Sequence, residues 1–334
     1  MATFNGREYV EQQLRSIAAQ TCPPDELVIA DDGSSDGTLD LLEAFRRDAP
    51  FPVQLIVGEP RLGYMLNFDR ALTACHGDIV FLSDQDDVWL PHKVERVLRA
   101  FAERPATGLI IHDCIIADAD LAHEGATQLR NRGRMGRTTD DFVSGCCTAI
   151  RRGLLDALLP IPAAYDGHDT WLHGLAGLLG QRWVLPEALI YYRRHGRNLS
   201  SNPVASRVPV NRVLATLRVV AHRIRGYTPA LHARHLAACE VRYQMVADRL
   251  ASIATDPSRL PEIPSAVVGA AQARVLAWAV NTHVRVQALS LPRRRRVGAI
   301  LKALARGHYV RFNLPGAIVM DLLAERDTTL NQDT

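Results

Sequence analysis

Short apolar runs alternate with helical patterns along roughly the first 200 residues. Continuous or β-like apolar runs predict strands at Leu27–Ala30, Val53–Val57, Ile79–Leu82, Leu109–Ile116 and Trp183–Tyr192. Apolar residues at helical spacing predict helices at Glu8–Ala19, Thr38–Arg47, Gly63–Cys75, Pro91–Glu103, Leu154–Leu159 and Trp171–Leu179. This alternation predicts an α/β fold with a mostly parallel sheet covered by helices on both faces.

The pattern of residue types changes in the second part of the chain. Patterns of Ala, Arg, Leu and Val with helical periodicity run from about Val204 to Ala305, with an interruption near Asp256–Pro264. The stretch Asp118–Asp140, rich in Gly, Arg and Thr, is expected to be flexible. We place a domain boundary near Asn202–Pro203, which predicts a catalytic domain at 1–202 and a mainly helical region at 203–334.

Charge divides the chain at the same place. Residues 1–202 hold 20 Lys+Arg and 28 Asp+Glu, a net charge of −8, and residues 203–334 hold 19 and 8, a net charge of +11. We expect the acidic part to bind cations and the basic part, with Arg293–Arg296, to bind phosphates or an anionic membrane face. A solvated helical subdomain explains the basic part equally well. Nucleic acid is less favoured, because no recognition motif accompanies the charge.

The cysteines and the apolar runs predict a location. None of the six cysteines forms a C-x-x-C pair, so we expect six reduced thiols in a cytosolic protein. The polar N-terminus is not typical of a signal peptide, and no apolar run reaches the ~18 residues of a membrane span. We therefore expect a cytoplasmic protein, with peripheral contact at the inner face of the membrane through its basic part.

Carboxylates gather where two predicted strands end, and ligand sites of parallel sheets lie beyond the carboxyl ends of their strands. Asp31 and Asp32 suit hydrogen bonds to a nucleobase or ribose, and capping the next helix is an equal alternative. Asp84, Asp86 and Asp87 lie within four positions, a density that favours Mg²⁺ or Mn²⁺ held with a substrate phosphate. The alternative is that Asp86 or Asp87 caps the helix near Pro91, which leaves two like charges unexplained.

Two later segments carry further candidate chemistry. Asp169 opens a predicted helix in the segment GHDTW and suits either a general base or a helix cap. His168 is more readily explained as a capping or packing residue. The segment YYRRHGRN follows a strand and supplies Arg193, His195 and Arg197, which favour a phosphate. The alternative is a solvated basic turn.

Six segments in order resemble the family-2 inverting glycosyltransferases of the GT-A fold, in particular their rhamnosyltransferase-like branch. They are ATFNGREYVEQQLRSIAAQT, VIADDGSSDGT, GYMLNFDRAL, GDIVFLSDQDDVW, GHDTWL and YYRRHGRNLS. The resemblance covers about residues 2–202. It implies transfer of a sugar from a nucleoside diphosphate sugar to a saccharide or lipid-linked acceptor, with a divalent metal, in the synthesis of bacterial surface polysaccharide or glycolipid.

The resemblance also implies roles for individual residues. Asp169 would be the catalytic base, Asp86 a metal ligand, and His195 a ligand of the metal or the diphosphate. The donor nucleotide and sugar would be bound by Thr3, Asn5, Asp31, Asp32, Gly63, Asn67, Asp84, Arg193 and Arg197.

One departure and three alternatives remain. The family begins with a full apolar strand ahead of A-T-F-N-G, so we expect a natural start a few residues upstream of Met1, or a truncation. A non-catalytic nucleotide-sugar-binding protein on the same fold is the first alternative. A sugar-nucleotide nucleotidyltransferase would need a Gly-rich phosphate loop after the first strand, and a dehydrogenase would need G-x-G-x-x-G there.

Overall fold

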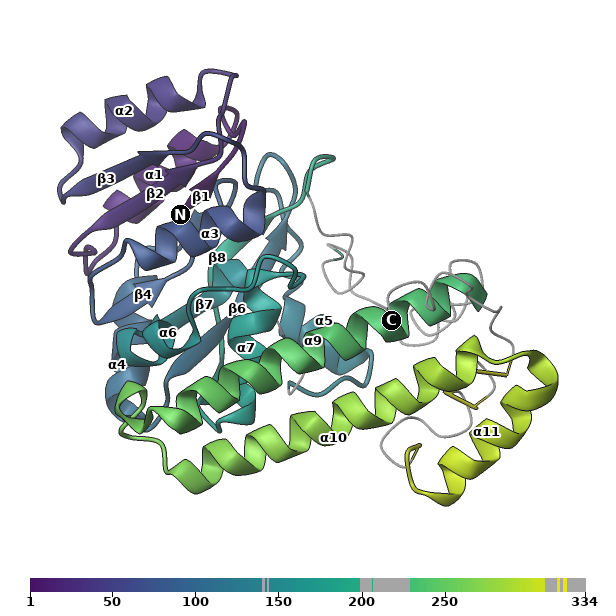
Figure 1. The fold of residues 1–334 in the computed structure, drawn as a ribbon. Coiled ribbons are helices and arrows are strands. Elements are labelled where there is room, and N and C mark those ends of the chain that lie inside the picture. The colour runs from purple at the N-terminus through teal and green to yellow at the C-terminus, as the bar shows by residue number, and fades with distance from the viewer. Residues whose placement is uncertain are drawn as a thin grey trace. The chain divides into compact units, whose positions relative to one another are not determined.

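A computed structural model describes residues 1–139, 142, 144–198, 206, 229–309, 317–318 and 321–322. The chain divides into two compact units, Met1–Ala215 and Thr216–Thr334 (Figure 1). The predicted boundary at Asn202–Pro203 lies outside the described residues, as does the first part of the predicted helical region. The assignment of domains therefore stays a prediction.

The first unit alternates strands and helices much as its apolar pattern predicts. The strands are β1 (Ala2–Thr3), β2 (Leu27–Asp31), β3 (Val53–Val57), β4 (Ile79–Phe81), β5 (Val88–Trp89), β6 (Leu109–Ala117), β7 (Thr148–Arg151) and β8 (Arg182–Arg193). The helices are α1 (Val10–Ala18), α2 (Thr38–Asp48), α3 (Tyr64–Thr73), α4 (Lys93–Glu103), α5 (Gln128–Arg134), α6 (Arg152–Leu158) and α7 (His168–Leu178), with a 3₁₀ turn, η1, at Gly145–Cys147.

The strands form two sheets. One is parallel with the order β1-β2-β3, and the other has the order β4-β7-β6-β8-β5. In the second sheet only the β6–β8 pairing is parallel, and the other three are antiparallel. A backbone hydrogen bond of 3.4 Å from Ala2 N to Ser83 O links β1 to the end of β4. The carboxyl ends of β1, β2 and β4 therefore meet at neighbouring places.

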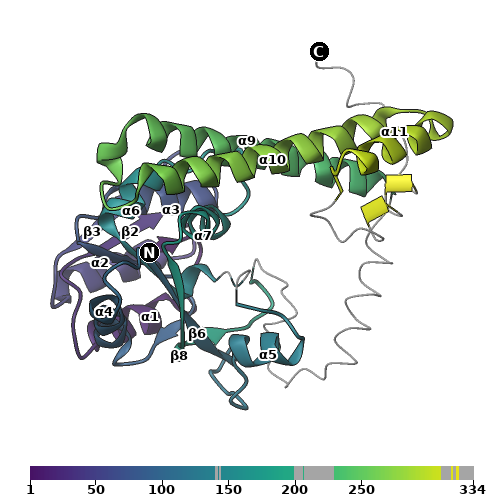
Figure 2. The same cartoon turned by 90° about the horizontal axis from the view of Figure 1, so that it is seen from below.

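The predicted α/β class is confirmed, with a correction to the sheet. Helices α3, α6 and α7 lie on one side of the strands, and α1 and α4 lie on the other (Figure 2). The sheet is mixed rather than mostly parallel, because β5 and β7 pair antiparallel with their neighbours. The sequence analysis missed both strands, since segments of two and four residues are too short for a periodic signal.

The stretch Asp118–Asp140 is not simply flexible, because it contains α5. Thr127 is the N-cap of this helix, and its hydroxyl accepts a hydrogen bond of 3.2 Å from Arg130 N. A capping threonine was the available signal for this helix. The high Gly and Arg content concealed it.

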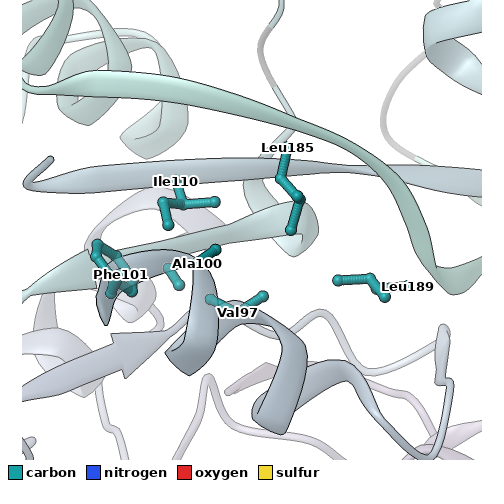
Figure 3. Packing of buried hydrophobic residues seen from close by; sticks show 7 residues of the cluster. Val97, Ala100, Phe101, Ile110, Leu185 and Leu189 are labelled. Carbon is teal, nitrogen blue, oxygen red and sulfur yellow. The ribbon is translucent and has the colours of Figure 1, made fainter. Parts of the chain in front are cut away.

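A core cluster shows how helical periodicity positions α4 (Figure 3). Val97, Ala100 and Phe101 lie on one side of the helix and pack against Ile110 of β6 and, among the residues of β8, Leu185. All are at most 1% exposed. This packing fixes α4, and with it the segment that joins β5 to the helix, against the sheet.

The described part of the second unit is helical. It comprises α9 (Pro229–Thr255), a 3₁₀ turn, η3 (Pro257–Arg259), α10 (Ser265–Ser290) and α11 (Arg293–Ala305). Helices α9 and α10 run alongside each other (Figure 1). The predicted interruption near Asp256–Pro264 is confirmed. None of the helices in the described ranges combines the length and the apolar character that crossing a membrane requires.

A buried polar cluster holds the second unit together around Asp321. Its carboxylate accepts hydrogen bonds from Arg285 Nε (2.8 Å) and Tyr309 Oη (2.5 Å), and it lies 2.6 Å from His232 Nε2. Burial alone would raise the pKa of Asp321, but the hydrogen bonds from His232 and Arg285 lower it below its usual value. The cluster joins α9 and α10 to the segments that follow α11.

We expect Phe101→Ala to lower the free energy of unfolding of the first unit by about 3–5 kcal/mol, because the lost ring leaves a cavity in the core. Val57→Ala is the control, since Val57 is 52% exposed and its loss should change stability by less than about 0.5 kcal/mol. Urea unfolding followed by tryptophan fluorescence measures both. Equal losses in the two variants would contradict the assigned core.

The Asp321 cluster predicts a dependence of stability on pH. Because the folded pKa of Asp321 is lowered, its stabilisation is complete above the unfolded pKa of about 3.9 and is lost as the pH falls through the folded value. Asp321→Asn should lower the free energy of unfolding by about 3–5 kcal/mol at pH 7. The difference in unfolding free energy between variant and wild type should become smaller below about pH 4. Asp248→Asn, at an exposed position of α9, is the matched control. Urea unfolding of the second unit, followed through Trp278, measures this difference. A difference that did not change with pH would refute the role of Asp321.

Candidate active site

The acidic turn, residues Asp84–Asp87, follows β4 as irregular backbone rather than as a strand end. Gln85 fastens it to the loop after β1. The Gln85 side chain accepts from Phe4 N (2.8 Å) and donates to Phe4 O (3.1 Å). A Cβ at Gly6 would lie 2.3 Å from Gln85 Oε1, so any larger residue there would displace the Gln85 amide. The sequence analysis missed Gln85, whose position between two aspartates was its only signal.

Two of the three carboxylates in this turn converge with a thiol. Ligand atoms of Asp84, Asp87 and Cys146 all lie within 4.8 Å of one another. Burial, together with the charges of Asp86 and Asp169, raises the pKa of Asp84 to about 7. Burial and the neighbouring carboxylates also raise the pKa of Asp87, and its Oδ2 has no hydrogen-bond partner among the described residues. The ionised forms of these two carboxylates are therefore disfavoured unless a cation lies nearby.

The alternative that Asp86 or Asp87 caps the next helix is wrong. Helix α4 begins at Lys93, its N-cap is His92, and no side chain caps it. Asp87 is fully buried, and its Oδ1 accepts from the backbone N of Arg193 at 3.1 Å. Asp87 thus fastens the acidic turn to the end of β8.

Lys93 is a buried cation beneath the acidic turn, and the sequence analysis did not identify it. Its Nζ donates to Cys146 O at 3.1 Å and lies 3.6 Å from the centroid of the Trp89 ring. Burial lowers the pKa of Lys93 to about 8. Its positive charge offsets part of the charge of Asp84 and Asp87.

Asp86 points away from this group and meets the loop after β8. His195 Nε2 lies 2.9 Å from Asp86 Oδ2, and Asn198 Nδ2 donates to the same oxygen at 3.3 Å. The His195 ring stacks on Tyr9, with 4.8 Å between ring centroids. The structure thus brings together the two side chains that the sequence analysis assigned to a metal, although 109 positions separate them.

The two arginines that were predicted to bind the donor differ from each other: Arg193 is the last residue of β8, and Arg197 lies in the loop that follows. Arg193 is 2% exposed, and its guanidinium donates to the backbone oxygens of Asp86 and Ala119 and to Gln12 Oε1. This departs from the expected donor contact, because all three guanidinium nitrogens already bond to protein atoms. Arg197 is exposed and forms an ion pair with Glu8.

The predicted donor-binding residues of the first sheet are mostly buried. Asp31 accepts from the Thr3 hydroxyl (2.7 Å) and from Ser34 N (2.7 Å). Asn67 of α3 donates to Ala30 O at 2.7 Å, which ties this helix to β2. Thr3, Asp31 and Asn67 therefore form a buried layer at the strand ends, which we call the wall of the site.

The exposed rim of this region comes from two loops. Asp32 accepts from Leu62 N (2.7 Å) and Gly63 N (2.8 Å) and so positions the loop before α3. In that loop Arg61, 62% exposed, places its guanidinium 3.6 Å from the centroid of the Phe4 ring, a contact that the sequence analysis missed.

Asn5 completes this rim from the loop after β1. It is exposed and has a φ of 47°, an unusual backbone conformation for a non-glycine residue. Its Oδ1 accepts from Ser35 N at 2.9 Å, which joins the loop after β1 to the loop after β2.

Asp169 lies in the first turn of α7, close to the acidic turn. Its charge contributes to the raised pKa of Asp84 and of Tyr64, in each case after burial. Gly145 leaves room for the His168 ring, because a Cβ there would lie 2.8 Å from His168 Nε2, and it would also be at ordinary contact distance from Asp169.

His168 packs rather than bonding to Asp169. Its ring stacks on Phe68 with a centroid distance of 3.9 Å, and burial lowers its pKa to about 4. The imidazole is therefore neutral at pH 7. Neither ring nitrogen has a hydrogen-bond partner in the part of the chain that the structure describes.

Residues 1–159 match Glycosyl transferase family 2. The putative teichuronic acid biosynthesis glycosyltransferase TuaG of Bacillus subtilis is 31% identical over 60% of this chain and 79% of its own length. The dTDP-rhamnosyl transferase RfbG of Shigella flexneri is 32% identical over 59% of this chain and 72% of its own length. The match spans less than two thirds of the length of two other curated relatives, namely 64% and 58%.

Among solved structures, Staphylococcus aureus TarS 1–349 in complex with UDP superposes with a TM-score of 0.54 at 16% identity. The match covers 96% of this chain and 86% of that one. At this identity the likeness concerns the fold alone. The sequence relatives show that the chain belongs to glycosyl transferase family 2, and the structural likeness agrees with the GT-A fold of that family.

Proposed function

We propose that this family-2 glycosyltransferase is inverting and transfers a sugar from a nucleoside diphosphate sugar to a hydroxyl of a saccharide or lipid-linked acceptor. The observation that carries the proposal is that Asp169, on α7, lies beside Gly145, whose neighbour Cys146 converges with Asp84 and Asp87 of the acidic turn. Inverting transfer needs a base at the acceptor and charge stabilisation at the leaving group, on opposite sides of one anomeric carbon.

In the proposed step, Asp169 takes the proton of the acceptor hydroxyl. The oxygen forms a bond to the anomeric carbon, and the bond from that carbon to the diphosphate oxygen breaks. The electron pair leaves with the nucleoside diphosphate. Asp169 is half-buried and can reach a bound hydroxyl, whereas the buried His168 supports the turn without sharing the proton.

A divalent metal fits the acidic turn. The carboxylate of Asp86 and the imidazole of His195 are donors to Mn²⁺ or Mg²⁺, and carboxylate oxygens are the type that both ions prefer. The crowded Asp84 and Asp87, with the unpartnered Oδ2 of Asp87, favour an additional positive charge nearby. A bound ion would neutralise charge on the departing diphosphate.

We place the donor nucleotide along the rim formed by Asn5, Arg61 and Gly63. Arg61 offers a guanidinium to a phosphate or a base, and Asp32 holds the loop that carries it. Thr3, Asp31 and Asn67 support this wall, Asp84 faces the donor sugar, and Arg197 lies near the diphosphate. Arg193 takes a positioning role instead.

The relatives favour the synthesis of a surface polysaccharide. RfbG is a dTDP-rhamnosyl transferase and TuaG a putative teichuronic acid biosynthesis glycosyltransferase, so dTDP-rhamnose is the first donor to test, ahead of UDP and GDP sugars. The six free thiols suit a reducing cytoplasm. A non-catalytic sugar-nucleotide binder is less favoured, because it has no need for Asp169 beside the acidic turn.

Asp169→Asn should lower the rate of transfer by at least about 100-fold, since it removes the base. Donor binding should stay within about twofold of the wild type, because the amide keeps the shape of the site. Asp166→Asn is the control, at an exposed carboxylate three positions earlier. Nucleotide release, product mass and calorimetric donor binding measure the outcome. Turnover of Asp169→Asn near the wild-type rate would show that the base is elsewhere.

We expect a chelator to abolish transfer and added Mn²⁺ or Mg²⁺ to restore it. Asp86→Asn and His195→Ala should each raise the metal concentration for half-maximal activity by about 10-fold or more, as the loss of a ligand would. Asp40→Asn, an exposed carboxylate of α2, should leave it unchanged. Mn²⁺ binding followed by electron paramagnetic resonance gives a readout without turnover. Activity that is unaffected by chelation would exclude the metal.

A further inference from the structure

The second unit carries a long segment without acidic residues. Residues 263–320 include no Asp or Glu but nine Lys and Arg. The acid that follows, Asp321, is buried and bonded to Arg285 and His232, so its charge is compensated internally. Among the side chains of this segment that the structure describes, five cations are exposed: Arg274, Arg294, Arg295, Lys302 and Arg306.

Helix α11 shows where this charge lies. Arg296, Ile300 and Ala303 are buried, and Arg296 Nη2 donates to Leu289 O at 2.9 Å. The four consecutive arginines are thus not one solvated run. The opposite side of the helix, which we name the outer face of α11, exposes Arg294, Arg295, Val297, Leu301, Lys302 and Arg306.

The outer face combines cations with large apolar side chains. Val297 and Leu301 are 48% and 61% exposed, and they are one helical turn apart. Exposure to water does not stabilise these two apolar side chains. Burying them against an apolar protein surface would also bury the neighbouring cations, which costs free energy because the cations lose their hydration. An interface between water and lipid accommodates both, since apolar groups insert while cations meet the headgroups.

A cavity adjoins this face. It has a volume of about 480 Å³, and its lining includes Gln287, Lys302, Arg306 and His308. His308 Nδ1 is held 2.8 Å from Asn281 Oδ1. Cations and an amide at one concave site suit the oxygens of a phosphate group. The cavity has room for the headgroup of a phospholipid whose chains stay in the bilayer.

We propose that the outer face of α11 and the adjoining cavity bind the surface of a membrane that contains anionic phospholipids. Nucleic acid is the main competing partner for a basic surface. It would be favoured by aromatic residues that stack on bases, but the residues of this face are aliphatic or cationic. Binding to lipid would hold the enzyme where a lipid-linked acceptor is found, although the proposal does not depend on that acceptor.

The test is flotation of the full chain with vesicles of phosphatidylcholine alone or with 30% phosphatidylglycerol. We expect binding to the anionic vesicles only, with a marked loss at high salt because screening weakens surface charge. Replacing Arg294, Arg295, Lys302 and Arg306 by Gln should lower the partition coefficient by at least about 100-fold. Replacing Val297 and Leu301 by Ser should lower it by about 10-fold or more.

A matched control removes four exposed cations from the first unit, Arg15, Arg46, Arg47 and Arg99, each replaced by Gln. It should partition within about twofold of the wild type if the site is local rather than a net-charge effect. Circular dichroism checks that every variant is folded.

Three results would overturn the proposal: no binding of the wild type to anionic vesicles, equal losses in the two four-site variants, or the same variants losing oligonucleotide binding while vesicle binding is unchanged. Because flotation needs no turnover, its outcome is independent of the proposed transfer reaction.

Discussion

The crowding of carboxylates in the turn after β4 is the constraint around which the proposed site is arranged. Asp87 is buried and Asp84 is half-buried beside it, and like charges repel strongly where little water surrounds them. The pKa of each is raised by burial first and by neighbouring carboxylates next. A fold that keeps such a pair must compensate it. Here the buried ammonium of Lys93 and a hydrogen bond from the backbone of Arg193 supply part of that compensation.

The turn is held by contacts that reach far along the chain. Gln85 bonds to the backbone of Phe4, Asp87 to the backbone of Arg193, and Asp86 to His195. The first bond joins the turn to the loop after β1, and the other two join it to the end of β8 and the loop that follows. The result is a preorganised set of polar groups, which a charged reaction needs because reorienting dipoles during the step costs free energy.

The two units show different uses of charge. In the first unit, carboxylates face inward at the strand ends and are tied by backbone hydrogen bonds. In the second unit, the carboxylate of Asp321 is compensated inside the helical cluster, and cations remain outside on α11. Both arrangements follow from one rule, since a buried charge needs partners and an exposed one does not.

The sequence by itself determined the α/β class, the helices with a clear apolar side and the identity of the acidic candidates. These features are local, because the spacing of apolar residues and the position of a strand end can be read along the chain. The pairing of Asp86 with His195 was inferred from their chemistry and from a family resemblance, and its distance came only from the folded chain.

Only the tertiary structure decided which side chains serve as support. Arg193, expected at the donor, is buried among backbone oxygens, and Lys93, which had no distinctive spacing, lies beneath the acidic turn. The short strands β5 and β7 likewise exist through their pairing, not through a pattern of their own. The physical reason is the same in each case: burial and hydrogen-bond partners are set by residues distant in sequence, which no local pattern encodes.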